Sequence, residues 1–418
     1  MAGNKEKIRY ILGVQSFANA DSGACILRFS EDGKILDFVA ISEERLIRKK
    51  FPYTFPIHSI GYCMDYYDIK SLSEIDLLVS DYIRKDRWFI SGPSFNVSDF
   101  DYKKIKFDFD PKRIITIRHH LAHAASAYYT SGFDNAATLI LDGNGSDLET
   151  TTYYSCTGTE ITPIESYKAR GIGIAYGQVT SRILNLGTGG EGKTMGLAPY
   201  GKNHPKVLEI SGELDGIKNN FAKFMKRMPF SDVLNQIDEK NRIYPFKTDY
   251  KKCQNKDELL QPYFSRVAYD IQEETERVMK HLATDLYRKT NSKNICLAGG
   301  VALNSVANKK MFDSSNFERI FVFPACSDAG IPFGLAIWGY YNAPQFIGAR
   351  KGKIQFKHAY TGKTYSTEHI QKMFQRFDIN YKKTNVKTIA KLLSQGKIIG
   401  WFQGASEYGP RSLGHRSI

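Results

Sequence analysis

The densest group of chemically active side chains is three histidines, His119, His120 and His123, in the segment RHHLAHAASAYY. A strand pattern precedes this segment and a helix pattern begins within it. Residues at i and i+4 share one face of a helix, so His119 and His123 could bind one cation with two imidazoles. His120 would face away from that side and is a candidate catalytic acid–base group. For a single HxxxH motif, an ordinary capping or packing role is the alternative.

Two aspartates stand where strand patterns end and could complete such a site. Asp142 follows the apolar run AATLIL, and Asp328 follows the strand pattern Arg319–Phe323 at the start of a helix. Ligands in open α/β sheets bind at the carboxyl ends of strands. Imidazole nitrogens with carboxylate oxygens suit iron, zinc or manganese. We therefore expect a divalent-metal site with four candidate ligands, His119, His123, Asp142 and Asp328.

Glycine-rich segments nearby could hold phosphate groups. GTGGEGKTMGLAPYGK, from Gly187 to Lys202, combines six glycines with two lysines, although its spacing is not that of a Walker A loop. Glycines let the backbone approach a ligand closely, and successive N–H groups beside lysine can bind an anion. The junction Gly299–Gly300 lies between a strand pattern and a helix pattern, where N–H groups point at a ligand. A merely flexible loop is the alternative for the first segment.

The surrounding elements predict an α/β fold with two related halves. Apolar runs at Ile8–Val14, Cys25–Phe29 and Ile35–Ile41 are predicted strands separated by short turns. This beginning is similar to that of nucleotide-binding domains of the actin and Hsp70 type. Each half supplies strands, helices, a glycine loop and an acid at a strand end, so we expect a ligand in the cleft between two lobes.

Several further elements are predicted from periodicity and turn residues. We expect a hairpin after the DGNG loop and a strand over Ile75–Ser80. The predicted helices cover Pro56–Tyr66, Tyr176–Leu184 and Phe264–Arg288. Residues 203–263 are polar and poorly periodic, and we interpret them as an insertion that could form a lid or a substrate-recognition region.

Composition is that of an ordinary globular protein. The chain has 418 residues, 42% hydrophobic and 24% charged, enough for two or three domains. Its six cysteines form no CxxC pair, so neither a zinc site nor a disulfide framework is indicated. No apolar run is long enough to cross a bilayer. We expect a cytoplasmic location and no membrane partner.

The net charge of +14 is concentrated toward the carboxyl end. Residues 350–418 hold fourteen Lys and Arg against three acids, whereas the other 349 residues carry only +3. This shift predicts a domain boundary near Asn342–Gly352 and an anionic partner. A solvated surface without a partner is the alternative. Helices over Thr367–Phe377 and Val386–Gln395 and a strand over Lys397–Phe402 are predicted here.

Taken together, seven motifs resemble the O-carbamoyltransferase family of antibiotic-tailoring and nodulation-factor enzymes. They are, in order, SEERLIRKK, HHLAHAASAYY, LDGNG, GEGKTMGLAPYG, LAGGVALN, PACSDAG and GWFQGASEYGPRSLGHRSI. The resemblance implies a two-lobed, actin-like (ASKHA, ribonuclease H-like) domain of the Kae1-like type, followed by a YrdC-like domain. It assigns residues 1–345 to the first domain, with lobes of about 1–165 and 166–345, and 350–418 to the start of the second. We expect this second domain to be incomplete.

The resemblance also implies a reaction and its residues. The second domain would make carbamoyl-adenylate from carbamoyl phosphate and ATP, and the first would transfer the carbamoyl group to a hydroxylated small molecule using a metal, usually iron. The four candidate metal ligands match the family's ligands. Lys193 and Gly196 would lie in the phosphate and substrate cleft, and Lys193 and Asp21 are further catalytic candidates. Nucleotide and carbamoyl phosphate contacts are implied for Gly143, Gly145, Gly299, Gly300, Asn304, Arg411 and Arg416.

The sequence departs from the family pattern in the first loop and after DGxG. Ala20, ahead of Asp21 and Ser22, stands where the family usually has His, and Ser146 stands where it commonly has Glu. These departures leave two alternatives open. A Kae1-like tRNA threonylcarbamoyl transferase would bind RNA in a salt-sensitive way, although nucleic acid is not the expected partner. A non-catalytic relative would bind metal and nucleotide without turnover. A sugar or acetate kinase would explain the fold but not the histidines.

The acceptor cannot be identified from the sequence. We expect its contacts from residues 203–263 and from the basic loop at 43–50. The oligomeric state stays open, with a homodimer as one option.

Overall fold

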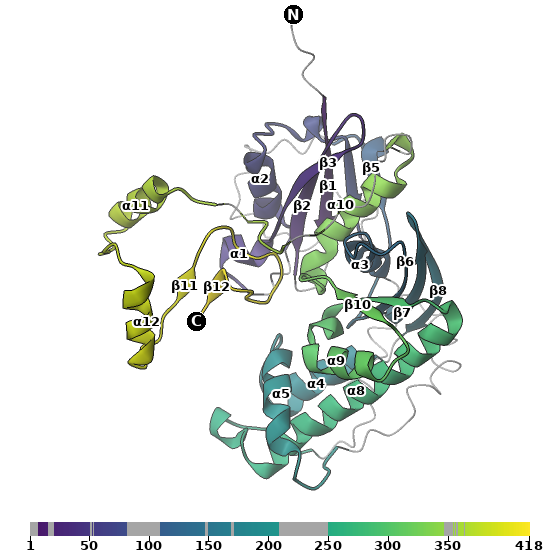
Figure 1. Ribbon diagram of the computed structural model, residues 1–418, viewed down its shortest axis with the longest axis vertical. Helices are drawn as coiled ribbons and strands as arrows, with labels where there is room; N and C mark the ends of the chain where they lie inside the picture. The colour runs from purple at the N-terminus through teal and green to yellow at the C-terminus, as the bar shows by residue number, and fades with distance from the viewer. Residues whose placement is uncertain are drawn as a thin grey trace, which may run out of the picture.

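The structure is a computed structural model that describes residues 7–15, 21–50, 52, 54–81, 109–146, 149–168, 171–208, 250–346, 354, 356, 358–362 and 364–418. Ala20 and most of the predicted insertion, 209–249, lie outside the described residues. Two five-stranded sheets form the centre of the molecule (Figure 1).

The first sheet has the strand order β3-β2-β1-β4-β5. β1 pairs antiparallel with β2, and β2 with β3, while β4 and β5 continue the other side of β1 in parallel. Leu12 and Val14 of β1 are fully buried on one face, whereas Ile11 belongs to the core on the other face. The strands are β1 Ile8–Gln15, β2 Gly23–Ser30, β3 Ile35–Ser42, β4 Leu77–Ser80 and β5 Ile114–Thr116.

The second sheet repeats this topology. Its order is β10-β9-β6-β7-β8, so β6 has the central place that β1 has in the first sheet. β6–β7 and β7–β8 are antiparallel, and β6–β9 and β9–β10 are parallel. The repeat confirms the predicted two-lobed actin-like α/β class. The strands are β6 Asn135–Leu141, β7 Glu149–Thr157, β8 Glu160–Lys168, β9 Asn294–Ala298 and β10 Arg319–Val322.

Two helices lie in the core between the sheets. α10 packs on β1, β2 and β4, while α3 packs on β6 and β9, and α3 and α10 contact each other (Figure 1). Their apolar residues join both sheets into one large hydrophobic core. α2 covers the opposite face of the first sheet. The bounds are α1 Glu43–Ile47, α2 Ile57–Tyr66, α3 His119–Tyr128 and α10 Ile331–Asn342.

The remaining helices of the second lobe pack around the long helix α8. Its buried face, including Phe264, Val267 and Ile271, forms a separate core with α4 and α5. The predicted helix at 176–184 is α4, which continues as a π-helical turn, η4. The bounds are α4 Ile172–Gln178, η4 Val179–Ile183, α5 Glu191–Leu197, η5 Ala198–Gly201, α8 Pro262–Thr290 and α9 Ser305–Asp313. Short 3₁₀ turns are η1 Leu72–Glu74, η3 Pro111–Arg113, η7 Lys256–Glu258, η8 Gly300–Leu303, η9 Asp328–Gly330 and η10 Pro344–Phe346.

The carboxyl-terminal part lies on the side of the first sheet, next to α1 (Figure 1). It contains α11 Thr367–Arg376, α12 Val386–Ser394, and the strands β11 Trp401–Phe402 and β12 Arg416–Ser417. Neither helix buries a residue. The predicted strand over 397–402 is confined to β11, because only Trp401 and Phe402 pair with β12.

Two further predictions bear on the architecture. The predicted lobe boundary at about residue 165 does not coincide with the change of sheet, because β6, β7 and β8 already belong to the second sheet. The hairpin expected after DGNG is the β7–β8 pair. Within the described ranges, no helix combines the length and apolarity needed to cross a membrane.

Candidate active site

The predicted metal-binding side chains come from one helix and two strand ends. His119 is the first residue of α3, and its backbone N–H donates to Ser146 Oγ at 2.9 Å. The serine that departs from the family pattern therefore helps to cap this helix. His123 lies one turn later on the same face. Asp142 follows β6, and Asp328 begins η9 after β10.

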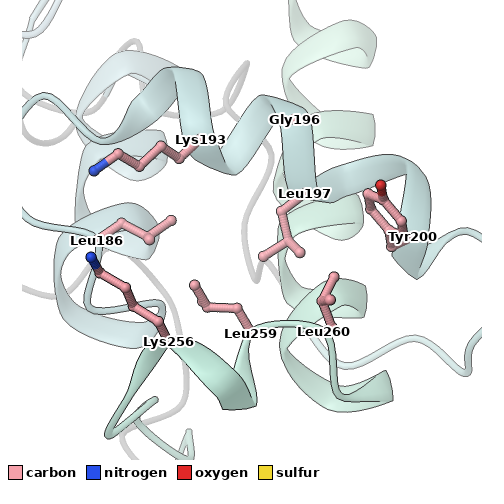
Figure 2. Close-up of a pocket in the computed structure, with 8 residues that line it drawn as sticks. All are labelled: Leu186, Lys193, Gly196, Leu197, Tyr200, Lys256, Leu259 and Leu260. Atoms are coloured by element: carbon pink, nitrogen blue, oxygen red, sulfur yellow. The ribbon is translucent and has the colours of Figure 1, made fainter. Parts of the chain in front are cut away.

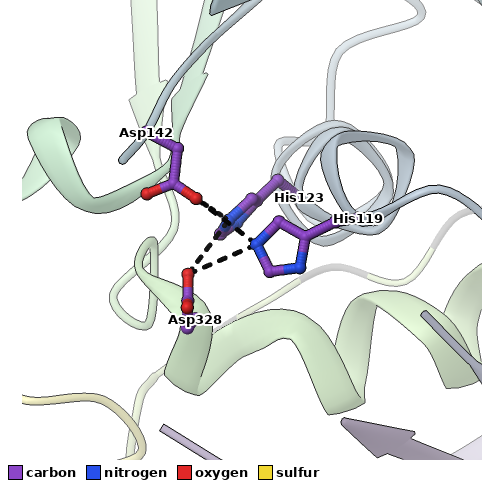
Figure 3. A group of neighbouring side chains, drawn as sticks. All are labelled: His119, His123, Asp142 and Asp328. Carbon is purple, nitrogen blue, oxygen red and sulfur yellow. Dashed lines mark ion pairs between the residues drawn. The ribbon is translucent and has the colours of Figure 1, made fainter. Parts of the chain in front are cut away.

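The structure brings these four side chains together (Figure 3). His119 Nε2 lies 3.3 Å from Asp142 Oδ2 and 3.4 Å from Asp328 Oδ1. His123 Nε2 lies 3.5 Å from each of the same two oxygens. One ligand atom from each residue can be chosen so that all four lie within 4.8 Å of one another. Two nitrogens and two oxygens thus point at one small volume.

A divalent cation fits this volume. Metal–ligand bonds of about 2.0–2.2 Å in a tetrahedron place neighbouring ligand atoms roughly 3.3–3.6 Å apart, which matches the four nitrogen–oxygen distances, and a small contraction of pairs as far apart as 4.8 Å would complete the coordination. His119 Nε2 and His123 Nε2 are buried and, apart from these ion pairs with the two carboxylates, have no hydrogen-bond partner among the described residues. Buried polar atoms without a partner are costly, and coordination would satisfy them.

Electrostatics favour a cation as well. Burial opposes ionisation of Asp142, but His119 and His123 outweigh it and hold the pKa of this carboxyl well below its usual value. Burial would lower the pKa of His119, yet Asp328, Asp142 and Asp81 together raise it well above the usual value. Ionised carboxylates therefore attract positive charge, supplied either by protonated imidazoles or by a metal ion that displaces their protons.

Asp81 belongs to this site and was not predicted. It follows β4, is 3% exposed, and its Oδ2 accepts a hydrogen bond from His119 Nδ1 at 2.8 Å. This contact fixes the imidazole so that Nε2 faces the cluster. The sequence pattern that could have identified Asp81 was present, because Asp81 is an acidic residue at the end of a predicted strand, as Asp142 and Asp328 are.

Backbone contacts join the cluster to the glycine junction. Asp142 Oδ1 accepts from the Gly300 N–H at 2.9 Å, while Oδ2 faces the histidines. Gly299 has a φ of +91° and donates to the Cys326 carbonyl at 2.7 Å. A Cβ on Gly299 would meet the Leu141 carbonyl oxygen at 2.1 Å. This glycine is therefore required for the ends of β6, β9 and β10 to meet.

Two predicted residues make hydrogen bonds to other side chains or to the backbone in the described structure. Asn304 caps α9, since its Oδ1 accepts from the Ala307 N–H, and its amide exchanges hydrogen bonds with Gln272 of α8. His120 is 1% exposed, and its Nδ1 lies 2.7 Å from Thr152 Oγ1. Burial lowers the pKa of His120 well below its usual value, so this imidazole is neutral.

Asp21 and the DGNG glycines border the cluster. Burial, then the Asp328 and Glu44 carboxylates, raises the pKa of Asp21 to about 7. Gly143 faces open space, since a Cβ there would meet no atom within 4 Å. Gly145 instead closes its loop, because its N–H donates to the Glu149 carbonyl at 2.7 Å.

Lys193 and Gly196 line a pocket at α5 (Figure 2). The pocket has a volume of about 390 Å³. Figure 2 shows the side chains of Lys193 and Lys256 extending to the same side of it. Its other lining residues are mostly apolar: Leu186, Leu197, Tyr200, Leu259 and Leu260. Lys256, Leu259 and Leu260 belong to the predicted insertion.

The carboxyl-terminal segment 404–417 reaches α5 and the turn η8 through the side chain of Arg411. The Arg411 guanidinium donates to the Leu303 carbonyl at 3.4 Å, and its Nη1 would lie 3.0 Å from a Cβ on Gly192. Arg411 therefore lies between the two predicted phosphate-binding loops. Arg416 is used differently, because its Nε donates to Glu407 Oε2 at 2.6 Å within the segment.

The chain is thus a two-lobed α/β protein with a histidine–carboxylate cluster at its strand ends. Residues 86–337 match the family model described as carbamoyltransferase N-terminus, and residues 390–418 match the one described as carbamoyltransferase C-terminus. The chain belongs to the carbamoyltransferase family.

Curated relatives agree with this assignment. The nodulation protein NolNO of Sinorhizobium fredii is 30% identical over 95% of this chain and 58% of its own length. An uncharacterized protein of Synechocystis is 30% identical over 98% of this chain and 70% of its own length. The 3'-hydroxymethylcephem-O-carbamoyltransferase of Streptomyces clavuligerus is 23% identical over 34% of this chain and 26% of its own length. The chain spans 51% to 70% of the length of the relatives that match most of it.

Solved structures with a similar arrangement are distant. The HypF of T. kodakarensis has a TM-score of 0.41 and 15% identity, covering 83% of this chain and 49% of that one. A ROK family glucokinase from Streptomyces griseus has a TM-score of 0.33 and 12% identity, covering 78% and 98%. The fold assignment therefore rests on the sheet topology described above.

Proposed function

We propose that this chain carries out the transfer step of a metal- and ATP-dependent O-carbamoyltransferase, which moves a carbamoyl group from carbamoyl phosphate, through carbamoyl-adenylate, to a hydroxyl of a small molecule. The observation that carries the proposal is the cluster of His119, His123, Asp142 and Asp328 in a chain of this family. In this scheme residues 1–345 perform transfer, and 350–418 belong to the adenylate-forming domain.

The four cluster residues would hold a divalent ion, with iron, zinc or manganese compatible with their donor atoms. Such an ion would polarise the carbamoyl carbonyl and offset charge that develops on its oxygen. Asp81 would keep His119 oriented, and the Gly300 N–H would hold Asp142 in place.

Arg411 supports a phosphate site next to the cluster. Its guanidinium lies between the loop at Gly192 and the turn that ends at Leu303, and that turn begins at Gly300 beside Asp142. A guanidinium there would neutralise the phosphate of the adenylate. We assign Gly143 and Gly299 to the same site, since Gly143 faces open space where a ligand can approach the backbone closely and Gly299 allows the strand ends to meet beside it.

In the transfer step the acceptor oxygen would form a bond to the carbamoyl carbon. The bond between that carbon and the phosphate oxygen would break, and AMP would leave. The acceptor proton needs a base. Asp21 is our candidate because it stands beside Asp328, and because the neighbouring position, where the family usually has His, is Ala20 and cannot accept a proton. Asp21 would accept the proton and release it to solvent.

The proposal is tested with the purified chain, metal, and a panel of hydroxylated small molecules. One arm supplies carbamoyl phosphate with ATP, and a second supplies chemically prepared carbamoyl-adenylate. Mass spectrometry follows carbamoyl-adenylate, carbamoylated product and AMP. We expect product in the second arm, lost in His123→Ala and in Asp21→Asn.

The outcomes separate the alternatives. Adenylate formed in the first arm would show that the chain also performs activation. Metal binding without transfer in either arm would contradict catalysis and favour a non-catalytic relative. Tight, salt-sensitive tRNA binding would favour the tRNA-modifying alternative.

A further inference from the structure

Gln15, the last residue of β1, connects two parts of the candidate site through one side chain. It is fully buried. Oriented so that its nitrogen faces both acceptors, the amide donates to the Asp328 carbonyl at 2.7 Å and to the Asp21 carbonyl at 2.8 Å. Both N–H groups of the amide are thereby satisfied. A single buried amide thus ties a predicted metal ligand to the proposed base.

Gly13 makes this reach possible. Residues two apart on a strand lie on the same face, so Gly13 lies on the same side of β1 as Gln15. A Cβ on Gly13 would meet the Pro332 carbonyl oxygen at 2.0 Å and the Ala336 nitrogen at 2.9 Å. The absence of a side chain at Gly13 therefore brings the start of α10 against β1. Asp328 lies just before this helix, within reach of Gln15.

The two carbonyls belong to segments that lead to or from different sheets. Asp328 follows β10 of the second sheet, and its Oδ1 faces both histidines. Asp21 precedes β2 of the first sheet, and the next residue, Ser22, accepts from the Glu43 N–H at 2.8 Å. Gln15 links the two segments by hydrogen bonds to both carbonyls, in addition to the packing of β2 on α10.

We propose that Gln15 is a positioning residue that sets the backbone of Asp328, and with it the carboxylate, for metal binding, and that holds Asp21 beside it. This inference rests on the proposed metal site. Without the amide donors, the Asp21 carbonyl would lose this partner and the Asp328 carbonyl would keep the Ile331 N–H, so the turn at Asp328 could relax away from the histidines. Hydrogen bonds to the ligating side chains typically change metal affinity by about 10- to 100-fold, and we expect a change of the same order from this backbone contact.

The test uses the full chain with Gln15→Met, which keeps the length of the side chain but removes its donors, and Gln15→Glu, which keeps its shape. Asn294→Leu is the matched control. The buried Asn294 amide also donates to a backbone carbonyl, that of Asn135, but it lies at the start of β9, the end of the strand away from the cluster. Zn²⁺ and Mn²⁺ affinities are measured by competition with a chromophoric chelator. The absorption spectrum of bound Co²⁺ and the metal-free melting temperature are recorded for each variant.

We expect both Gln15 variants to bind metal about 10- to 100-fold more weakly, with an altered Co²⁺ spectrum, whereas Asn294→Leu changes only the melting temperature. Affinities within twofold of the unaltered chain would overturn the inference, as would an equal loss in the control. An unaltered chain that binds no metal would overturn both this inference and the metal site. Because no acceptor or nucleotide is needed, failure of carbamoyl transfer alone leaves the inference standing.

Discussion

Asp81 shows how one buried hydrogen bond can tune a metal ligand. Its contact with His119 Nδ1 fixes the tautomer and leaves Nε2 for an ion. We predict that Asp81→Asn weakens Zn²⁺ binding by about 10- to 100-fold, as measured by chelator competition. The control is Asp313→Asn, on the exposed surface of α9. Equal affinities in both variants would show that Asp81 does not act on the metal.

Glu407 carries a prediction about pH. Its Oε1 accepts from the N–H groups of Leu413 and His415 at 2.8 Å each, and its Oε2 pairs with Arg416. Burial alone would raise the pKa, but Arg416 and these N–H groups lower it to about 2. A lowered folded-state pKa stabilises the fold above the unfolded value of 4.5. This contribution is lost as the pH falls from there toward about 2.

The measurement compares urea unfolding of the unaltered chain and Glu407→Gln, from about pH 6 down to about pH 3. We expect Glu407→Gln to be less stable at the higher pH, with the difference shrinking below about pH 4.5. A difference that stays constant over this range would contradict the assignment, because other titrating groups cancel between the two proteins.

At the level of single residues, the sequence predicted the four residues of the cluster but not the residues that position them, Asp81 and Gln15. Acids at strand ends and an HxxxH spacing are local patterns, so Asp142, Asp328 and the histidines could be predicted. Gln15 could not, because its partners are backbone carbonyls whose positions depend on the packing of α10. Asn304 matched a family motif, but in the described structure its amide is occupied by a helix cap and by Gln272.

Among the elements, the segment 404–417 is anchored by Tyr408 and Gly409. Tyr408 is 4% exposed and packs against the ring of Phe323. Gly409, with a φ of +111°, lies so close to Pro324 that a Cβ would meet its carbonyl oxygen at 2.6 Å. Arg45 of α1 adds a hydrogen bond to the Gly409 carbonyl at 3.3 Å. These contacts place the segment against the loop that leads to Asp328.

We predict that Gly409→Ala loosens this segment. Gly414→Ala is a matched control, because Gly414 has a φ of +106° but a Cβ there would meet no atom within 4 Å. Both variants carry the strain of a positive φ, roughly 1–2 kcal/mol, and only Gly409→Ala adds the clash. We expect faster limited proteolysis within 404–417 and a lower melting temperature for Gly409→Ala. Identical behaviour of both variants would contradict a tightly docked segment.

Long, strongly patterned elements were predictable, and boundaries set by tertiary contacts were not. The apolar spacing of 264–288 predicted α8, and the apolar runs near the start of the sequence predicted β1, β2 and β3. The strand expected at 397–402 shortened to Trp401–Phe402, because pairing with β12 decides its length. The expected lobe boundary at 165 missed the change of sheet, because strand patterns do not reveal which sheet a strand joins.

For the whole molecule, a bound ion would act as a clamp. His119 and His123 lie on α3 in the core between the sheets, while Asp142 and Asp328 follow strands of the second sheet. A ligand that binds only the folded state at 100 times its dissociation constant stabilises it by about 2.7 kcal/mol. We predict that Zn²⁺ raises the melting temperature, that EDTA reverses the change, and that His123→Ala abolishes it. An equal rise in His123→Ala would place the binding elsewhere.

The contact between β1 and α10 also imposes an order on biogenesis. Gly13 near the start of the chain packs against Pro332, more than three hundred positions later. Contacts so distant in sequence form slowly, and domains emerge from the ribosome from their amino-terminal end. One apolar face of the first sheet therefore stays exposed to solvent, and can make non-native contacts, until translation has passed Asn342. A nascent chain thus exposes this face from the synthesis of β1 until α10 has been made.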